Sequence, residues 1–300
     1  MNLSWLTYNS SVLTRSSDPL GALPAGGQKH VVCQYLSGSR PMTDGRWDSS
    51  TQVDAANNIW DVYCASDDWH AMFTGNNAAT LLRIIDADLT GVTDVSGLFS
   101  QCSGLYDVQL RNLSSVTDMS MMFNKCASIR DIYMDGVSAV TNTKSMFYQC
   151  LRIESVPLFD TSNVTDMSYM FYQCEKLKSV PMFDMSSNTT MEWMFYDCYD
   201  LTSVPLFDTS SVTSMRRAFQ SCRSLKEVPL LDTSSVTNMA ETFYDCVQVE
   251  SGAPALYTQA STQATPPSSH NNCFAYCGYD TVSGSADLFL IPRSWGGYAA

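Results

Sequence analysis

The chain has 300 residues, and 45 % of them are apolar, so it can bury a sizeable core and is not disordered as a whole. Its 30 acidic residues outnumber 17 lysines and arginines, and the net charge of −13 excludes nucleic acid as a partner, because phosphate binding needs clustered positive charge. No apolar stretch approaches the roughly 18 residues that cross a bilayer, so we expect no membrane insertion.

Residues 1–72 share no repeat with the rest of the chain and are rich in tryptophan, serine and glycine. This composition favours short strands and loops over long helices. The first residues lack the charged and apolar regions of a secretory signal, so we expect either a mature form or a protein that reaches its place without such a signal. We predict that residues 1–72 form a non-repeat amino-terminal domain that caps the next segment and attaches the chain to a partner.

Residues 73–257 repeat with a period of 24 residues. Seven cysteines recur at this interval, and we call them the cysteine ladder: Cys102, Cys126, Cys150, Cys174, Cys198, Cys222 and Cys246. A phenylalanine lies three residues before each ladder cysteine; from the second unit on these are Phe123, Phe147, Phe171, Phe195, Phe219 and Phe243. We expect both columns to form the repeat core, because repeats of this length stack to bury apolar faces that no single unit can bury.

One unit, residues 163–184, illustrates the structure that we expect of each. The apolar spacing i, i+3, i+4, i+7 over Met167–Cys174 predicts a short helix, with Thr165 as its N-cap. A short strand should follow, in which Val180 and Met182 point inward. We therefore predict an α/β repeat, with short parallel strands on one side of a stack and short helices on the other.

The repeat consensus V-T-x-M-x-x-M-F-x-x-C-x-x-L-x-x-V-P-x-F-D-T-S, as in NVTDMSYMFYQCEKLKSVPMFDMS, resembles the BspA-like leucine-rich repeats. The resemblance covers about residues 80–257 and implies a leucine-rich-repeat solenoid. Members of that family occur in surface proteins of gut and oral bacteria, in mycoplasmas and in phages of gut bacteria. Most are adhesins or surface-display modules, so the resemblance implies binding rather than catalysis.

Residues 258–300 leave the repeat. They open with a polar loop, TQASTQATPPSSHNN, which precedes one last F-x-x-C motif from Phe274 to Cys277. The final SADLFLIPRSWGGYAA is expected to fold back as a carboxy-terminal cap that covers the last repeat.

The cysteines admit more than one interpretation. If each ladder cysteine ends a helix, its neighbours lie 8–10 Å away, too far for a disulfide, and we expect buried free thiols that suit a reducing compartment. No ladder cysteine has a histidine nearby, which disfavours a metal site. Cys33, Cys64, Cys273 and Cys277 could still form disulfides.

Each of four units carries an aspartate directly after the predicted strand: Asp160, Asp184, Asp208 and Asp232. Stacked carboxylates could collect calcium. The alternative is that each aspartate caps its own turn, because serine or threonine follows at once. We favour the second interpretation and predict no metal site.

The outward positions of the strands are the binding candidates. Prolines recur there, and an apolar residue follows each of them two positions later: Phe159, Phe183, Phe207 and Leu231. Together with Tyr133, these residues would form an exposed apolar stripe, which usually marks a binding surface. The alternative is that they turn under the next loop into the core.

Catalysis finds little support. The chain has no G-x-S-x-G, H-E-x-x-H, P-loop or G-x-G-x-x-G motif, and its three histidines all lie outside the repeats. Carboxylates near tryptophan and histidine, such as Asp44, Asp48, Asp61, Asp67 and Asp68, leave open an enzyme site within residues 1–72. We predict no enzyme activity and no cofactor.

These observations favour a non-enzymatic structural and adhesive protein on the surface of a phage virion, made in the host cytoplasm. The amino-terminal domain would contact other virion proteins or an anchoring protein, and the solenoid would contact a host surface protein or glycan. A homo-oligomer is expected, because phage appendages are usually symmetric. The alternative is an adhesin on a bacterial cell surface that binds host proteins.

Overall fold

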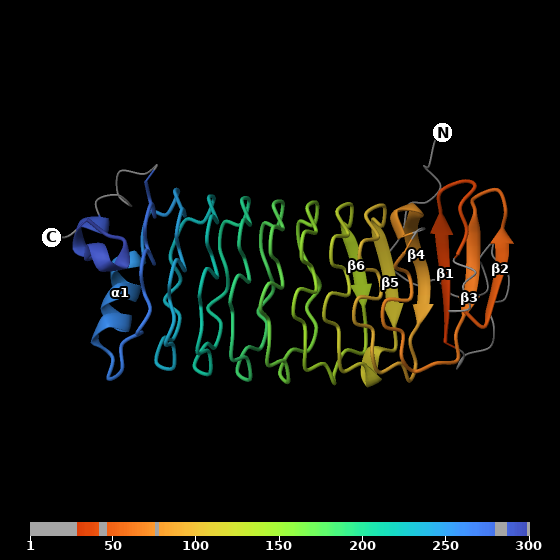
Figure 1. The fold of residues 1–300 in the computed structure, drawn as a ribbon, viewed down its shortest axis with the longest axis horizontal. Helices are drawn as coiled ribbons and strands as arrows, with labels where there is room; N and C mark the ends of the chain where they lie inside the picture. Colours follow the sequence, from red (N-terminus) through yellow and green to blue (C-terminus); the bar gives the residue numbers. More distant parts are fainter. Residues whose placement is uncertain (1–28, 42–46, 76–77, 280–286, 299–300) are drawn as a thin grey trace.

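The computed structural model describes residues 29–41, 47–75, 78–279 and 287–298. The chain winds into an elongated row of coils, with the amino-terminal strands at one end and a helix at the other (Figure 1). In the described part of the chain, no helix could span a bilayer.

Six strands form one sheet in the order β2-β3-β1-β4-β5-β6. Their bounds are His30–Tyr35 (β1), Ser49–Asp54 (β2), Ile59–Tyr63 (β3), Leu81–Asp88 (β4), Asp107–Arg111 (β5) and Asp131–Met134 (β6). Strand β1 pairs antiparallel with both β3 and β4, whereas β4, β5 and β6 run parallel. The described non-repeat residues thus lengthen the parallel sheet of the first coils with three antiparallel strands.

Parallel backbone bridges hold the coils in register. They join Asp68, Asp94, Asp118, Asn142, Asp166, Thr190, Ser214, Asn238 and Ser269 in sequence. Beside them runs a column of threonines one period apart, in which the N–H of Thr189, for example, donates to the carbonyl of Thr165 at 3.0 Å. Each coil therefore contacts only its two neighbours along the row.

The predicted repeat helices are wrong. Met167–Cys174 is a run of turns, in which the Met170 N–H donates to the Met167 carbonyl, three residues back. Alternate N–H groups, such as that of Phe171, donate instead to the next coil, here to the Met194 carbonyl at 2.9 Å. Half of the backbone N–H groups that would form hydrogen bonds within a helix therefore form them with the neighbouring coil.

Left-handed residues make this geometry possible. Two residues in each of these turn runs have positive φ, for example Tyr169 (59°) and Gln173 (56°). Thr165 is not a helix cap, because its hydroxyl donates to the Thr141 carbonyl of the preceding coil. Positive φ interrupts any helix every fourth residue, while the same apolar side chains still point inward.

The core runs along the whole row. Successive phenylalanines stack face to face, with ring centroids 5.5 Å apart for Phe123–Phe147 and for Phe147–Phe171. All seven ladder cysteines and the stacked phenylalanines are completely buried. Beyond β6 no further strand forms within the described residues, because a proline in each coil removes a donor from the ladder.

Three short helical segments lie at the carboxy-terminal end of the stack: α1 (Ala253–Thr262), η3 (Leu288–Leu290) and η4 (Arg293–Trp295). Two others, η1 (Ala78–Thr80) and η2 (Leu113–Ser115), lie in the first coils. Phe274 stacks on Phe243 at 5.9 Å and extends the core by one coil. Its N–H donates to the Trp295 carbonyl at 2.9 Å, so the η4 segment covers the end of the stack. Part of the expected carboxy-terminal cap, residues 280–286 and 299–300, lies outside the described residues.

Candidate functional site

The V-P-x-F segment places one large apolar side chain of each coil in solvent. In three coils the N–H of the second residue after the proline donates a hydrogen bond to the proline carbonyl. In one of them, the Phe183 N–H donates to the Pro181 carbonyl at 2.9 Å. This is the hydrogen bond of a γ-turn, whose central residue points outward. We call the exposed residue after the proline of each of the four coils the apolar row: Leu158, Met182, Leu206 and Leu230, with exposed fractions of 63 %, 57 %, 62 % and 51 %.

The predicted binding stripe is therefore displaced by one residue. Phe159, Phe183, Phe207 and Leu231 are buried, with exposed fractions of 7 %, 1 %, 3 % and 0 %, so the prediction that they form an exposed stripe is wrong. Met182 is exposed although we expected it to point inward, whereas Val180 is buried as expected. The γ-turn reverses the alternation that a regular strand would impose. Tyr133 precedes the proline-containing coils and is 49 % exposed.

An acidic column borders the apolar row two residues further along each coil. It consists of Asp160, Asp184, Asp208 and Asp232, all of them exposed. One carboxylate oxygen of each accepts the N–H of a serine two residues on, at 3.0 Å from Ser162 to Asp160. The turn-capping interpretation of these aspartates is thus confirmed.

Hydrogen bonds favour the charged form of three aspartates in the acidic column. Hydrogen bonds from Ser162 lower the pKa of Asp160, and those from Ser186 and Ser210 lower the pKa values of Asp184 and Asp208. Within the described residues no lysine or arginine forms an ion pair with the column. A line of uncompensated carboxylates therefore flanks one side of the apolar row.

Charges on the other side of the apolar row are paired between coils. Lys178 contacts Glu154 at 2.6 Å, and Lys226 contacts Glu250 at 3.7 Å. Glu154, Lys178 and Lys226 lie four residues before the row residue of their coils, so they border the row on the side away from the acidic column. The two borders thus differ in net charge.

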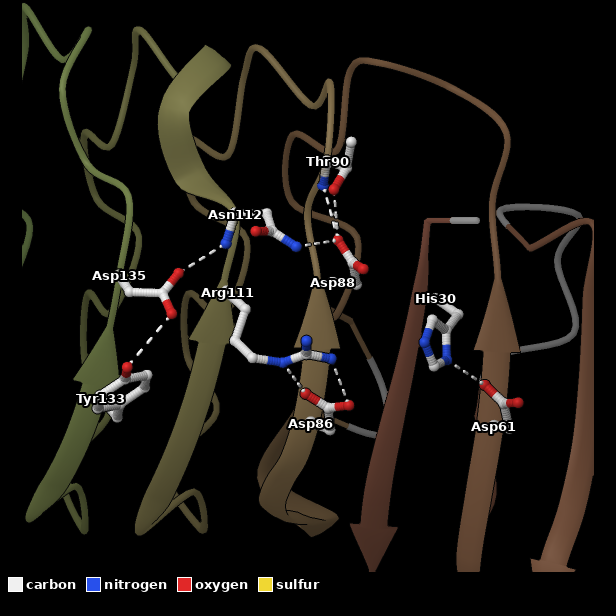
Figure 2. Close-up of polar contacts among 9 residues, drawn as sticks. All are labelled: His30, Asp61, Asp86, Asp88, Thr90, Arg111, Asn112, Tyr133 and Asp135. Atoms are coloured by element: carbon white, nitrogen blue, oxygen red, sulfur yellow. Dashed lines mark hydrogen bonds and ion pairs between the residues drawn. The ribbon is translucent and has the colours of Figure 1, made fainter. Parts of the chain in front are cut away.

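The sheet face over β3–β6 is polar instead. Figure 2 shows Arg111 of β5 forming two hydrogen bonds with Asp86 of β4, at 2.6 and 2.7 Å. Hydrogen bonding to Asp86 raises the pKa of Arg111. Burial opposes ionisation of Asp88, but hydrogen bonds from Asn112 and Thr90 lower its pKa overall.

Tyr133 ends this polar network. Its hydroxyl donates to Asp135 at 3.2 Å, and the Asp135 charge raises the pKa of the phenol (Figure 2). In the four coils that follow, proline occupies the register of Tyr133.

Of the five carboxylates considered for catalysis, the four that the structure describes each have a separate partner. Asp61 lies 3.2 Å from Nδ1 of His30, which comes from β1 (Figure 2). His70 contacts the Ser96 hydroxyl at 2.7 Å, and Asp67 pairs with Lys29. Asp48 accepts the Ala65 N–H at 2.7 Å, and Asp68 that of His70 at 2.9 Å. Asp44 lies outside the described residues.

All eleven cysteines fall in described segments, and each is buried and free of disulfide bonds, including Cys33, Cys64, Cys273 and Cys277. The expected reason was wrong, because rings stacked from coil to coil lie 4.6 Å apart for Tyr148–Tyr172 and 5.5 Å apart for Phe123–Phe147, so the coils are much closer than 8–10 Å. Each ladder thiol donates instead to a phenylalanine carbonyl, as Cys174 does to Phe147 at 3.1 Å. Burial raises the pKa of Cys174 and of the other ladder thiols. Among the described residues no three His, Cys, Asp or Glu side chains cluster to hold a metal ion.

The turn side of the stack carries aromatic columns that sequence reasoning missed. Tyr148, Tyr172 and Tyr196 stack at 4.6 and 4.8 Å, so each ring covers the face of the next. Tyr244 holds the same position in a later coil, and its ring meets that of Tyr276, one position further along the last coil, edge to face. A shallow hollow of about 300 Å³ opens beside them, lined also by Asn272, Ala275, Gly296 and Tyr298.

The apolar row was also missed, although its signal is present in the sequence. The position after the proline is a leucine or methionine in all four coils, and phenylalanine or leucine follows it. Two adjacent large apolar residues cannot both point inward from an extended segment, so one of them must be exposed.

The chain is similar to three solved bacterial leucine-rich repeat proteins. The first is the Treponema pallidum (T. pallidum) Leucine Rich Repeat protein TpLRR: 19 % identity over 73 % of this chain and 91 % of that one, TM-score 0.41. A leucine-rich repeat protein from Eubacterium ventriosum shares 17 % identity over 56 % of this chain and 53 % of that one, TM-score 0.35. A leucine rich cell surface protein from Faecalibacterium prausnitzii shares 14 % identity over 77 % of this chain and 87 % of that one, TM-score 0.32.

A search of curated proteins finds no match. The profile of one family, described as "Mycoplasma protein of unknown function, DUF285", matches residues 67–179 and 151–255. Together the two matches span the stacked coils from the first backbone bridge at Asp68 to the start of α1, well over half of the chain. The chain belongs to this DUF285 family.

Proposed function

We propose that this chain is a non-enzymatic protein-binding module of the BspA-like type, in which the coils form a leucine-rich-repeat solenoid that displays the apolar row. The observation that carries this proposal is the exposure of Leu158, Met182, Leu206 and Leu230, each more than half exposed. Single exposed apolar residues are ordinary, but an aligned row bordered by polar side chains usually marks a protein interaction site.

The row has the composition of an interface centre. Leucine and methionine contribute large apolar area without charge, and methionine adapts to irregular partners. The polar borders described above supply a rim that stays hydrated. Tyr133, exposed in the preceding coil one residue before the row register, is included in the proposed surface.

We place the protein on an exposed biological surface. A phage virion is our first choice, with residues 1–72 attaching the chain to other virion proteins and the solenoid contacting a host surface protein or glycan. The free thiols support folding in a reducing cytoplasm before assembly. A bacterial cell surface, with an anchoring protein in place of the virion proteins, is the alternative, and a homo-oligomer is proposed for either setting.

A photo-crosslinking amino acid in place of Met182 tests the binding role. The full chain would be expressed in its natural source, irradiated, and recovered from purified phage particles and from washed cell envelopes. We expect a discrete crosslinked protein from position 182 in one of the two fractions. Met121, 46 % exposed on the turn side, is the matched control position and should give none.

The two fractions also decide location. Intact chain at a fixed ratio to the capsid protein would support the virion, and enrichment in envelopes alone would support the adhesin. An absence of crosslinks from position 182, or the same crosslinks from positions 182 and 121, would overturn the binding role of the apolar row.

A further inference from the structure

The spacing of the apolar row limits the shape of its partner. Equivalent side chains in successive coils are separated by one coil step, which is about 4.8 Å because parallel backbone bridges join the coils. The stacked rings of Tyr148, Tyr172 and Tyr196 show the same step, at 4.6 and 4.8 Å. The pitch of an α-helix is about 5.4 Å. A helix lying along the stack would therefore present about one turn to each coil and drift by only about 2 Å over the three steps from Leu158 to Leu230.

An extended strand does not match this spacing. Side chains on one face of a strand repeat every 6.4–6.8 Å or so. Over the three steps from Leu158 to Leu230, such a strand would drift by about 5–6 Å against the coils, which is at least one full coil step. Its four side chains would therefore not face the four row residues one to one.

The borders of the row limit the charge of the partner. The acidic column adds one unpaired carboxylate per coil on one side, whereas Lys178 and Lys226 on the other side are already paired with Glu154 and Glu250. A partner with cations beside its apolar stripe would gain from the acidic column, and one with carboxylates there would be repelled.

Building on the proposed function, we propose that the apolar row and the acidic column together bind a basic amphipathic α-helix of a partner protein, lying along the stack. Its apolar residues would occupy positions i, i+4, i+7 and i+11, one turn against each coil. Lysine or arginine would lie one position after each of them, on the adjacent stripe of the helix surface, and would face Asp160, Asp184, Asp208 and Asp232.

The test uses the full chain and a fluorescein-labelled peptide of 18 residues. The peptide carries leucine at i, i+4, i+7 and i+11, lysine after each leucine, and alanine or glutamine elsewhere. We expect saturable binding by fluorescence anisotropy that weakens between 0.05 and 0.5 M salt, because the cations face exposed carboxylates. A peptide with glutamate for lysine, and one with a central proline, should bind at least tenfold more weakly.

Variants of the chain separate the apolar and charged contributions. Met182→Ser with Leu206→Ser should weaken binding at least tenfold, since buried anchors dominate interfaces. Asp184→Asn with Asp208→Asn keeps an oxygen for each turn but removes two charges, and should weaken binding about twofold to tenfold at low salt. Asp94→Asn with Asp118→Asn removes the same charge from the other edge of the coils and should change peptide binding less than twofold. Thermal unfolding of each variant checks that the stack remains folded.

The outcomes separate this inference from the proposed function. Equal binding of the lysine, glutamate and proline peptides, or no binding of any, would overturn the basic helix. If position 182 still crosslinks a protein in that case, the protein-binding role stands and its partner has another shape. If position 182 also gives no crosslink, both proposals fail.

Discussion

Met182 and Phe183 are neighbours in the chain, yet Met182 is 57 % exposed and Phe183 is 1 % exposed. The hydrogen bond from the Phe183 N–H to the Pro181 carbonyl turns the backbone between them, so that one side chain faces solvent and the next faces the core. The two residues should therefore differ sharply when they are truncated.

We expect Phe183→Ala to lower the free energy of unfolding by about 3–5 kcal/mol, because it leaves a cavity under the γ-turn. Met182→Ala should change that free energy by less than about 0.5 kcal/mol, because an exposed side chain loses little on truncation. Urea unfolding followed by circular dichroism measures both. An equal loss of unfolding free energy in the two variants would show that Met182 also packs against the core.

The left-handed residues of the turn runs offer a stabilising change. Ser145 has a φ of 57°, and Gly97 occupies the same position two coils earlier with a φ of 61°. The left-handed conformation costs a non-glycine residue about 1–2 kcal/mol of folding free energy. Glycine avoids this cost but loses about 0.5–1 kcal/mol through the greater entropy of the unfolded chain. Ser145→Gly should therefore raise the free energy of unfolding by about 0.5–1 kcal/mol, seen as a higher melting temperature.

Ser155, exposed and without positive φ, is the control for this change. Ser155→Gly should leave the melting temperature unchanged or lower it, because only the entropy cost remains. A drop of similar size in both variants would contradict the strain that we assign to Ser145.

The thiols should make the fold sensitive to alkali. Burial raises the pKa of the ladder thiols above the ordinary 9.0 and that of Cys273 to about 12. The folded chain thus keeps protons that the unfolded chain releases above pH 9, so their contribution to stability is full below pH 9 and is lost as the pH rises. Each such thiol should steepen the loss by about 1.4 kcal/mol per pH unit.

Thiol labelling follows the same transition. With a chromogenic disulfide reagent at pH 8, the ladder thiols should remain unreacted in the folded chain and react together on unfolding. Cys174→Ala should make the alkaline loss of stability less steep by one proton. Rapid labelling at pH 8 without unfolding would contradict the buried state of the ladder.

The repeat and its core could be predicted from the sequence because spacing alone determines which side chains stack. Cys174 and Phe171 recur at fixed distances, and any backbone with one coil per 24 residues places them over their equivalents. The helix could not be distinguished from the turns, because the turn run of Met167–Cys174 buries the same i, i+3, i+4, i+7 set. Tyr169 and Gln173, at the positive-φ positions, give no glycine signal for the turns.

The candidate site shows the same limit. Period-two alternation placed Phe183 outside and Met182 inside, which is the reverse of the structure. The γ-turn after Pro181 is a local backbone conformation that the sequence did not predict, because the proline indicated only a missing hydrogen-bond donor. The acidic column was found because a turn-capping aspartate depends on its immediate neighbours, which the sequence shows directly.

Because each coil bonds to the next in the same way, one coil is interchangeable with another. If residues 165–188 were deleted, Val164 would be followed by Thr189, whose N–H could then bond to the Thr141 carbonyl as that of Thr165 does now. Duplication or loss of a 24-residue unit would thus add or remove one residue of the apolar row and one aspartate of the acidic column without changing the fold. The length of partner that this protein can hold is then a matter of copy number, which a gene can alter in a single recombination.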